Sequence, residues 1–424
     1  MAKLPLRKHL ERDPKIKELF SFKHWAGTTD VTPLATAVAL LMHHDAITGT
    51  PNQHVAYNYA KHLAVGAEHT NRMVHDALDT LRGIPDGPGR GAGLSHCPLL
   101  NQSECPALAN RSSFEIVADN PLGRTRRTNV IVPLYAATVP AVHNLATGAL
   151  VEVSVVPTAP ATASQLAAML PYGGKRAKRA LVIPTEIEPL QVQTFRVGEP
   201  PAKPASPLRA AVTMVIENER LAITFDNTTR HISAVTDKTT GQALKLTQRF
   251  LWYEGAMRGD GRWMLRPNNT DDTGRNLECA GPCLPTRFEL FKTAAVEEAH
   301  MVFGDWVTQV IRLPKHATSV EFEVTIGPVP IADGKGKEIV TRFATDIASG
   351  SEFTTDSNGL EMVGRVRDHR SYYNMTLTEP IASNYYPINS ALTVADDRLV
   401  ATLTPDRAVG GTSLASGELE LLLH

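Results

Sequence analysis

The first fifth of the chain has the apolar spacing of helices. After Pro33, which suits the first turn of a helix, apolar residues recur every three or four positions through residues 34–41. This pattern predicts a helix that ends around Asp45, before the stop signal Thr48-Gly-Thr-Pro51. Residues 4–22 predict an earlier and less regular helix, because Pro14 interrupts the pattern.

A second and longer helix is predicted to follow. Asn52 is a favourable N-cap residue, and an apolar stripe with helical spacing continues from there to Leu81. Gly83 and Pro85 then end the pattern. Helices joined by short connections pack antiparallel, so we expect this part of the chain to form an antiparallel helical bundle.

After about residue 110, short β-branched runs replace the helical spacing. Several runs alternate apolar and polar side chains with period two, as strands with one buried face do. Examples are residues 129–133, 150–156, 190–197 and 319–326. Proline and glycine turns separate these runs, and no helical pattern of comparable strength intervenes. The predicted fold class is therefore α+β with segregated domains, a helical bundle followed by β-sandwiches.

The distribution of glycine and proline suggests domain boundaries. Both residue types concentrate in residues 83–97 and again in Gly198-Glu-Pro-Pro-Ala-Lys-Pro-Ala-Ser-Pro207, as they do in linkers. We therefore expect a helical domain at residues 1–84 and a linker at 85–109. A small β-sandwich is expected at 110–200 and a larger one at 201–424.

The charge balance argues against nucleic acid as a partner. The chain has 43 Lys and Arg against 44 Asp and Glu, a net charge of −1, so no basic excess can neutralise phosphates. No apolar run approaches the roughly 18 residues that a membrane span needs. The first residues, Met-Ala-Lys-Leu-Pro-Leu-Arg-Lys, lack the apolar centre of a secretory signal peptide.

Sequons and cysteines nevertheless indicate the secretory pathway. Asn-x-Ser/Thr sequons occur at Asn101, Asn110, Asn227, Asn268 and Asn374. The cysteine pairs Cys97/Cys105 and Cys279/Cys283 lie in loop-like stretches and lack the spacing of zinc knuckles or redox motifs. We expect the first pair to form a disulfide, and the second pair can form one too; four reduced thiols are the alternative. Together these features suggest a secretory-pathway protein that has lost its beginning.

One cluster, His43-His44-Asp45, has side chains suited to chemistry. Neutral imidazole and carboxylate are the usual ligands of a catalytic zinc. Adjacent helical residues point about 100° apart, so on a helix only one of the two histidines would bind a given metal. The other histidine and the aspartate would then contact the ligand or a substrate. A hydrogen-bonded helix end without a metal is the alternative interpretation.

The same stretch resembles the signature of a known family. His43-His44-Asp45-Ala-Ile-Thr-Gly-Thr50 resembles the middle-domain motif of class II α-mannosidases, which form family 38 of the glycoside hydrolases. Cys97-Pro-Leu-Leu-Asn-Gln-Ser-Glu-Cys105 resembles the lysosomal branch, whose corresponding cysteines form a disulfide around a sequon. Further matches are Leu265-Arg-Pro-Asn268, Asn384-Tyr-Tyr-Pro-Ile-Asn389 and Gly410-Gly-Thr-Ser-Leu-Ala-Ser-Gly-Glu-Leu-Glu420. The resemblance covers nearly the whole chain.

The resemblance implies roles for individual residues. In the family, the second histidine of the motif is one of four zinc ligands, which implies that His44 binds zinc. The following aspartate contacts the bound mannose, which implies a substrate-binding role for Asp45, and His43 lines the same site. Where family members have a pocket-lining Gly-Ala-Tyr, this chain has Gly261-Arg-Trp263, so the implied mannose contact falls to Trp263.

The resemblance also implies a catalytic domain that these residues do not supply. The family hydrolyses α-mannosides with retention, using a carboxylate nucleophile and a carboxyl acid/base. Those groups and the other three zinc ligands belong to an N-terminal α/β barrel, and the 42 residues before His43 are too few to form one. We therefore expect the middle and C-terminal portion of a zinc-dependent α-mannosidase acting on glycans, inactive alone and without catalytic residues of its own.

Two roles remain open at this point. The chain could supply one zinc ligand, substrate contacts and a β scaffold to an N-terminal catalytic fragment provided in trans. Alternatively, it is a non-catalytic carbohydrate-binding or scaffolding remnant. An exposed apolar patch on residues 34–84 would favour the first role or a poorly folded product. The expected location is the lysosome or the lumen of another secretory compartment.

Overall fold

The chain divides into two compact units in a computed structural model that describes residues 31–85, 93–169, 175–198, 209–210, 213–256, 265–271, 274 and 277–423. One unit comprises residues up to Thr158 together with Met169–Pro207, and the other comprises Ala159–Ala168 together with Leu208–His424. The domain boundaries expected at residues 84, 109 and 200 stay a prediction. The helix expected within residues 4–22 and the linker at 198–207 fall largely or wholly outside the described residues.

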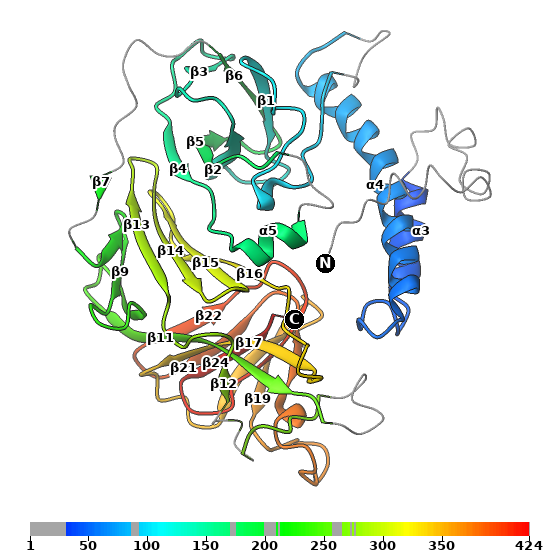
Figure 1. Ribbon diagram of the computed structural model, residues 1–424, viewed down its shortest axis with the longest axis vertical. Coiled ribbons are helices and arrows are strands. Elements are labelled where there is room, and N and C mark those ends of the chain that lie inside the picture. The colour runs from blue at the N-terminus through cyan, green and yellow to red at the C-terminus, as the bar shows by residue number, and fades with distance from the viewer. Residues whose placement is uncertain are drawn as a thin grey trace. The chain divides into compact units, whose positions relative to one another are not determined.

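The described part of the first unit begins with a helical hairpin. α3 (Thr32–Leu41) has its proline in the first turn, and α4 (Gln53–Leu81) begins directly after Asn52, as the sequence predicts. A Cβ atom on Gly66 of α4 would lie only 2.7 Å from the Cα atom of Leu34 in α3. Glycine therefore allows the two helices to touch, and Figure 1 shows α3 alongside α4.

A small β-sandwich completes the first unit. One sheet has the order β1-β6-β3 and the other the order β2-β5-β4, and all pairs are antiparallel. Their bounds are β1 (Phe114–Asp119), β2 (Arg126–Leu134), β3 (Val142–Asn144), β4 (Ser154–Pro157), β5 (Arg179–Ile187) and β6 (Val192–Val197). Buried residues of both sheets, among them Val142, Leu181 and Phe195, pack together as one core. A short 3-10 helix, η2 (Leu100–Gln102), precedes the sandwich.

The second unit is a larger β-sandwich built from three sheets. The first sheet has the order β20-β23-β24-β17-β11-β10-β9-β8, with β12 also pairing with β11. Its bounds are β8 (Val215–Glu217), β9 (Leu221–Phe225), β10 (Ile232–Asp237), β11 (Ala243–Glu254), β12 (Glu278–Cys279), β17 (Lys337–Thr345), β20 (Tyr386–Ile388), β23 (Val409–Thr412) and β24 (Glu418–Leu422).

The other two sheets cover this one. The five-stranded order β16-β15-β14-β13-β7 comprises β7 (Arg209–Ala210), β13 (Arg287–Lys292), β14 (Val296–Phe303), β15 (Val307–Pro314) and β16 (Glu321–Ile326). The four-stranded order β19-β18-β21-β22 comprises β18 (Glu352–Ser357), β19 (Glu361–Val366), β21 (Leu392–Ala395) and β22 (Val400–Leu403). A 3-10 helix, η3 (Ala382–Asn384), precedes β20. Phe250, Met301 and Phe353 come from the three different sheets and share one buried core.

One short helix of the second unit comes from an earlier part of the sequence. α5 (Ala163–Met169) buries Gln165, whose Nε2 donates to the carbonyl of Thr325 in β16 at 3.2 Å. The hydroxyl of Thr308 in β15 donates to Gln165 Oε1 at 3.4 Å. These hydrogen bonds place residues 159–168 in the second unit, although residues on both sides of them belong to the first.

The predicted β-rich fold class is confirmed, with one correction among the predicted strands. Residues 129–133 lie inside β2, and the strands predicted at 190–197 and 319–326 are β6 and β16. The run at 150–156 is a strand only from Ser154, because Leu150 bridges His143 in one sheet before β4 pairs with β5 in the other. The chain crosses from one sheet to the other there. Apolar and polar side chains therefore keep alternating through residues 150–156, although these residues do not pair with a single neighbouring strand.

Both cysteine pairs are disulfides. Cys97 is bonded to Cys105 and Cys279 to Cys283. Cys105 is fully buried, and its backbone N–H donates to the hydroxyl of Tyr135 at 3.0 Å. Within the ranges that the structure describes, no helix combines the length and apolarity that crossing a membrane requires.

Candidate metal centre

The cluster His43-His44-Asp45 lies in the turn that follows α3. The helix was predicted to end around Asp45, but it ends at Leu41, because the N–H groups of Met42 and His43 bond to carbonyls only three residues back. These hydrogen bonds span three residues, as in a 3-10 turn, and they end the α-helix before the cluster. The argument that helical neighbours point about 100° apart therefore does not apply to His43 and His44, since neither is on the helix.

The three side chains converge instead. Asp45 Oδ2 lies 3.6 Å from His43 Nε2 and 3.9 Å from His44 Nε2, and the two imidazole centroids are 4.3 Å apart. One nitrogen or oxygen from each residue fits within a 4.8 Å span. Two ligands about 2.1 Å from a tetrahedral zinc are themselves about 3.4 Å apart. The two imidazoles and the carboxylate thus fit a zinc ion by donor type and approximately by spacing.

Two threonines hold the turn in this arrangement. The Thr50 hydroxyl donates to Asp45 Oδ1 at 2.8 Å, and the Thr48 hydroxyl donates to the His44 carbonyl. The two hydroxyls also lie 3.1 Å from each other. Thr50 is buried, so it fixes one carboxylate oxygen and leaves Oδ2 directed at the imidazoles. Such hydrogen bonds to a ligand's free atom are the usual means of orienting a metal ligand.

The cluster is open to solvent. The side chain of His44 is 83% exposed, against 43% for His43 and 38% for Asp45. Exposed contacts between polar side chains contribute little to stability. The cluster therefore adds little to the stability of the fold. Its exposure leaves the imidazole nitrogens accessible to a ligand. Trp263, the other sequence-predicted site residue, lies outside the described residues.

A buried polar network in the second unit was not found from the sequence. Glu420 of β24 is 1% exposed and accepts hydrogen bonds from the hydroxyls of Tyr253 and Tyr385 and from Arg342 Nε. Arg342 also donates to the Gly274 carbonyl at 2.7 Å. Burial raises the pKa of both tyrosines, and the Glu420 charge raises it further, so both stay protonated donors.

The sequence signal for this network was a carboxylate inside an apolar strand, Leu419-Glu-Leu421. Which groups meet Glu420 depends on strand pairing that the local pattern does not contain, because Arg342 lies directly opposite it in β17. Burial lowers the pKa of Arg342, but the Glu420 charge outweighs that and raises it. The ion pair joins β17 to β24. The hydroxyls of Tyr253 in β11 and of Tyr385, which directly precedes β20, attach two further segments to Glu420.

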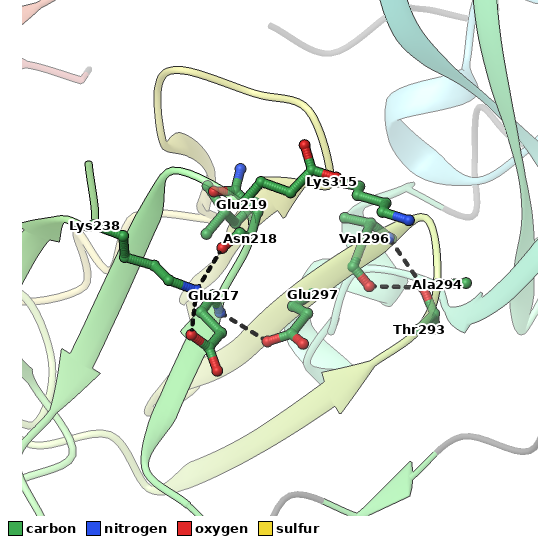
Figure 2. A pocket seen from close by; sticks show the side chains of 10 residues that line it. Glu217, Asn218, Glu219, Lys238, Thr293, Ala294, Val296, Glu297 and Lys315 are labelled. Atoms are coloured by element: carbon green, nitrogen blue, oxygen red, sulfur yellow. Dashed lines mark hydrogen bonds and ion pairs between the residues drawn. The ribbon is translucent and has the colours of Figure 1, made fainter.

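The second unit also contains a surface pocket of about 400 Å³, drawn in Figure 2. Its charged lining comes from Glu217, Glu219, Lys238, Glu297 and Lys315, and no aromatic ring is among the lining residues. Carboxylates beside a pocket, here those of Glu217, Glu219 and Glu297, raise the question of acid/base chemistry.

The hydrogen bonds of the pocket argue against that chemistry. Lys238 Nζ donates to Glu217 Oε2 at 2.7 Å, and this bond lowers the pKa of Glu217. Glu297 accepts the Glu217 N–H at 2.8 Å and pairs with Lys292 at 3.1 Å. Glu217 therefore stays ionised and cannot act as a general acid. The His43–His44–Asp45 cluster remains the stronger candidate.

The chain is similar in sequence to a known protein family and to several characterised proteins. The profile described as "Glycosyl hydrolases family 38 C-terminal domain" matches residues 216–424. The chain is 33% identical to the lysosomal alpha-mannosidase of Homo sapiens over 417 residues, which cover 94% of this chain and 38% of the human protein. It is 32% identical to an alpha-mannosidase of Canavalia ensiformis over 416 residues, covering 92% and 41% respectively.

A solved structure shares the fold. A protein in glycosyl hydrolase family 38 from Enterococcus faecalis superposes with a TM-score of 0.54 at 15% identity, over 91% of this chain and 47% of that one. At this identity the likeness concerns the fold alone. The chain spans about two fifths of the length of the curated relatives it matches.

Proposed function

Because this chain belongs to family 38 of the glycosyl hydrolases, we propose that it is part of a zinc-dependent, retaining α-mannosidase that hydrolyses terminal α-mannosides of N-glycans and glycoproteins. The observation that carries this proposal is the convergence of His43, His44 and Asp45 within one turn. The alpha-mannosidase names of the relatives supply the substrate class.

In this proposal each residue of the turn has a distinct role. His44, the most exposed of the three, binds zinc through its imidazole. Asp45 accepts hydrogen bonds from mannose hydroxyls, and Thr50 keeps its carboxylate in place. His43 lines the same site beside Asp45. Zinc, when bound, supplies a positive charge that polarises and orients sugar hydroxyls.

The bond-breaking carboxylates are assigned to a part of the enzyme beyond these 424 residues. Retaining hydrolysis needs a nucleophile and an acid/base about 5 Å apart. In the surface pocket of the second unit, Glu217 is kept ionised by Lys238, so it cannot serve as the acid. Residues 1–424 alone should therefore bind zinc and mannosides without turning them over.

The surface around the cluster supports docking of that other part. Val38, Met42 and Ile47, which flank His43-His44-Asp45 in the sequence, expose 47%, 63% and 60% of their surface. Apolar side chains exposed together around a polar site are typical of interaction surfaces. A catalytic domain bound there, in the same chain or in trans, would bring the remaining zinc ligands. Two disulfides and the lysosomal relatives support a location in the lysosome or another secretory compartment.

The proposal is tested by zinc binding to the chain and its single-residue variants. Zinc affinity is measured by competition with a chromogenic chelator for the wild-type protein, His44→Ala and Asp45→Asn. We expect His44→Ala to lose at least ten-fold in affinity, as loss of a ligand should. His316→Ala is the matched control, because His316 is another exposed imidazole, 3.3 Å from a single carboxylate.

Activity towards a chromogenic α-mannoside is then measured with the catalytic domain supplied. Under the proposal, His44→Ala abolishes turnover, while Asp45→Asn raises KM with zinc content unchanged. Equal zinc affinity of the wild-type protein, His44→Ala and His316→Ala would refute the metal role of the turn. Zinc binding without any gain of hydrolysis on adding the catalytic domain would favour the non-catalytic carbohydrate-binding or scaffolding role.

A further inference from the structure

The five sequon asparagines are all exposed, but their surroundings differ. Asn101, Asn110, Asn227, Asn268 and Asn374 all lie on the surface. Asn268 engages its side-chain amide with Glu254, whereas the Asn374 amide makes no hydrogen bond to another described residue. Asn374 is also the one sequon with exposed aromatic side chains within two positions, namely Tyr372 and Tyr373. An accessible amide in a surface loop is what N-glycosylation requires.

The segment that carries Asn374 is held at both ends. Asn384 is 1% exposed, and its Nδ2 donates to Asp368 Oδ1 at 2.6 Å and to the Pro380 carbonyl at 2.8 Å. The Asp368 N–H donates a hydrogen bond of 2.9 Å to Asn384 Oδ1. The guanidinium of Arg370 lies 5.0 Å from the ring centre of Tyr386. These contacts fix the stems of the loop, so the intervening residues are presented at a defined place on the surface.

The two tyrosines form an exposed aromatic pair. Tyr372 is 81% exposed and Tyr373 50%, and their ring centroids are 5.2 Å apart at an angle of 61°. Aromatic rings carry a large apolar surface that is normally covered, and the C–H face of a pyranose is a surface that can cover one. The only other sequon with an aromatic residue two positions away is Asn227, and that residue, Phe225, is 2% exposed.

We propose that Asn374 carries an N-linked glycan and that Tyr372 and Tyr373 pack against its first sugar residues. The proposal rests on the secretory location that is part of the proposed function. In the modification, Asn374 Nδ2 forms a bond to C1 of the first N-acetylglucosamine of a lipid diphosphate oligosaccharide. The C1–O bond to the diphosphate breaks, the diphosphate leaves with the electron pair, and Nδ2 loses one proton.

The first experiment is glycopeptide mass spectrometry of the protein from its natural source. We expect an N-glycan at Asn374. A chain with glycans at other sequons and none at Asn374 would overturn this inference alone. A chain with no glycan at any of the five would instead overturn the secretory location on which it rests. The two failures are therefore distinguishable.

The second experiment tests the packing of the sugar. Secreted, glycosylated protein is treated in its folded state with a peptide:N-glycanase, and release is timed separately at Asn374 and Asn227. We expect slower release at Asn374 in the wild-type protein. In Tyr372→Ser/Tyr373→Ser, release at Asn374 should become about five-fold faster while release at Asn227 stays unchanged.

Leu360→Ser is the matched control, because Leu360 is an 88% exposed apolar residue in the second unit with no sequon beside it. It should change neither rate. Equal release at Asn374 in the wild-type protein and the double tyrosine variant would refute the sugar contact. All three substituted side chains are exposed by half or more, so the variants are expected to fold.

Discussion

Thr50 donates its hydroxyl to Asp45 Oδ1 at 2.8 Å, and the other carboxylate oxygen, Oδ2, is the one that faces the imidazoles of His43 and His44. The buried Thr50, which follows the turn, thus sets the orientation of the partly exposed Asp45 within it. The site depends on this bond as much as on the three side chains that would contact metal or sugar.

Replacing that hydroxyl should weaken the substrate contact assigned to Asp45. Thr50→Val keeps the shape of the side chain but leaves Asp45 Oδ1 without its donor, so the carboxylate can rotate away from its position. We expect KM for a chromogenic α-mannoside, measured with the catalytic domain supplied, to rise about ten-fold at unchanged zinc content. Thr50→Ser retains the hydroxyl and should stay near wild type. Equal KM values for the two variants would contradict the orienting role.

Gly66→Ala should destabilise the helical hairpin although alanine is the better helix former. At an open helix position the substitution would gain about 1 kcal/mol. Here the new Cβ would lie 2.7 Å from the Leu34 backbone, so α3 must move away from α4. We expect a net loss of about 1–3 kcal/mol in the free energy of unfolding.

The measurement is urea unfolding followed by far-UV circular dichroism. Ala64→Gly, an exposed position on the same helix, calibrates the propensity effect and should cost about 1 kcal/mol. Because α3 leads into the turn with His44, zinc affinity should fall in Gly66→Ala and not in Ala64→Gly. A stabilised Gly66→Ala protein would show that the helices are not in close contact in solution.

Glu420→Gln should be among the most damaging single substitutions in the second unit. It leaves the guanidinium of Arg342 buried without its opposite charge, which costs about 3–5 kcal/mol. Tyr253→Phe removes one hydrogen bond to Glu420 and keeps the ion pair, so about 1 kcal/mol is expected. Urea unfolding of both variants gives the comparison. Similar losses would mean that the charge pair is not what holds these strands together.

Asp356→Asn should destabilise the second unit in a pH-dependent manner. Asp356 is buried, and its carboxylate accepts backbone N–H groups from Asn389, Ser390, Ala391 and Gly359. Burial alone would raise the pKa of Asp356, but these donors lower it well below its ordinary value. An amide has one acceptor oxygen in place of two, so we expect a loss of about 2 kcal/mol at pH 7.

The sign of the pH dependence follows from the lowered pKa. The charged form stabilises the fold fully above the ordinary aspartate pKa of about 3.9, and this stabilisation is lost as pH falls through the lower folded value. Unfolding free energies at pH 7, 5 and 3 should therefore show the same gap between wild type and Asp356→Asn at pH 7 and 5, and a smaller one at pH 3. A gap that widens at pH 3 would contradict this account.

The fold was largely predictable because its signals are local. Pro33 and Asn52 mark helix starts, and period-two alternation marks strands such as β6 and β16. The candidate cluster His43-His44-Asp45 was also singled out from the sequence, and its metal role stays a prediction. The convergence of its side chains was not predicted, because it depends on the helix ending at Leu41 rather than Asp45, and three-residue hydrogen bonds decide that end.

The least predictable features are carboxylates whose partners are distant in sequence. Glu420 meets Tyr253, which is 167 positions away, and Asp356 meets backbone groups more than 30 positions away. The local sequence shows such a residue only as a charged side chain within an apolar strand. The groups that pair with this charge are set by the register of neighbouring strands. That register depends on the packing of the whole unit.

The sequence-defined domain and the packed one are not the same piece of chain. The family match begins at residue 216, yet Gln165 of α5 is bonded to Thr308 and Thr325, far inside that domain. Residues 159–168 thus leave the first unit, join the second and return. A protease that cuts once between residues 198 and 213 would separate two polypeptides that remain interlocked through this ten-residue segment. In evolution, likewise, the two units cannot be exchanged by a single recombination point without losing a piece of the second.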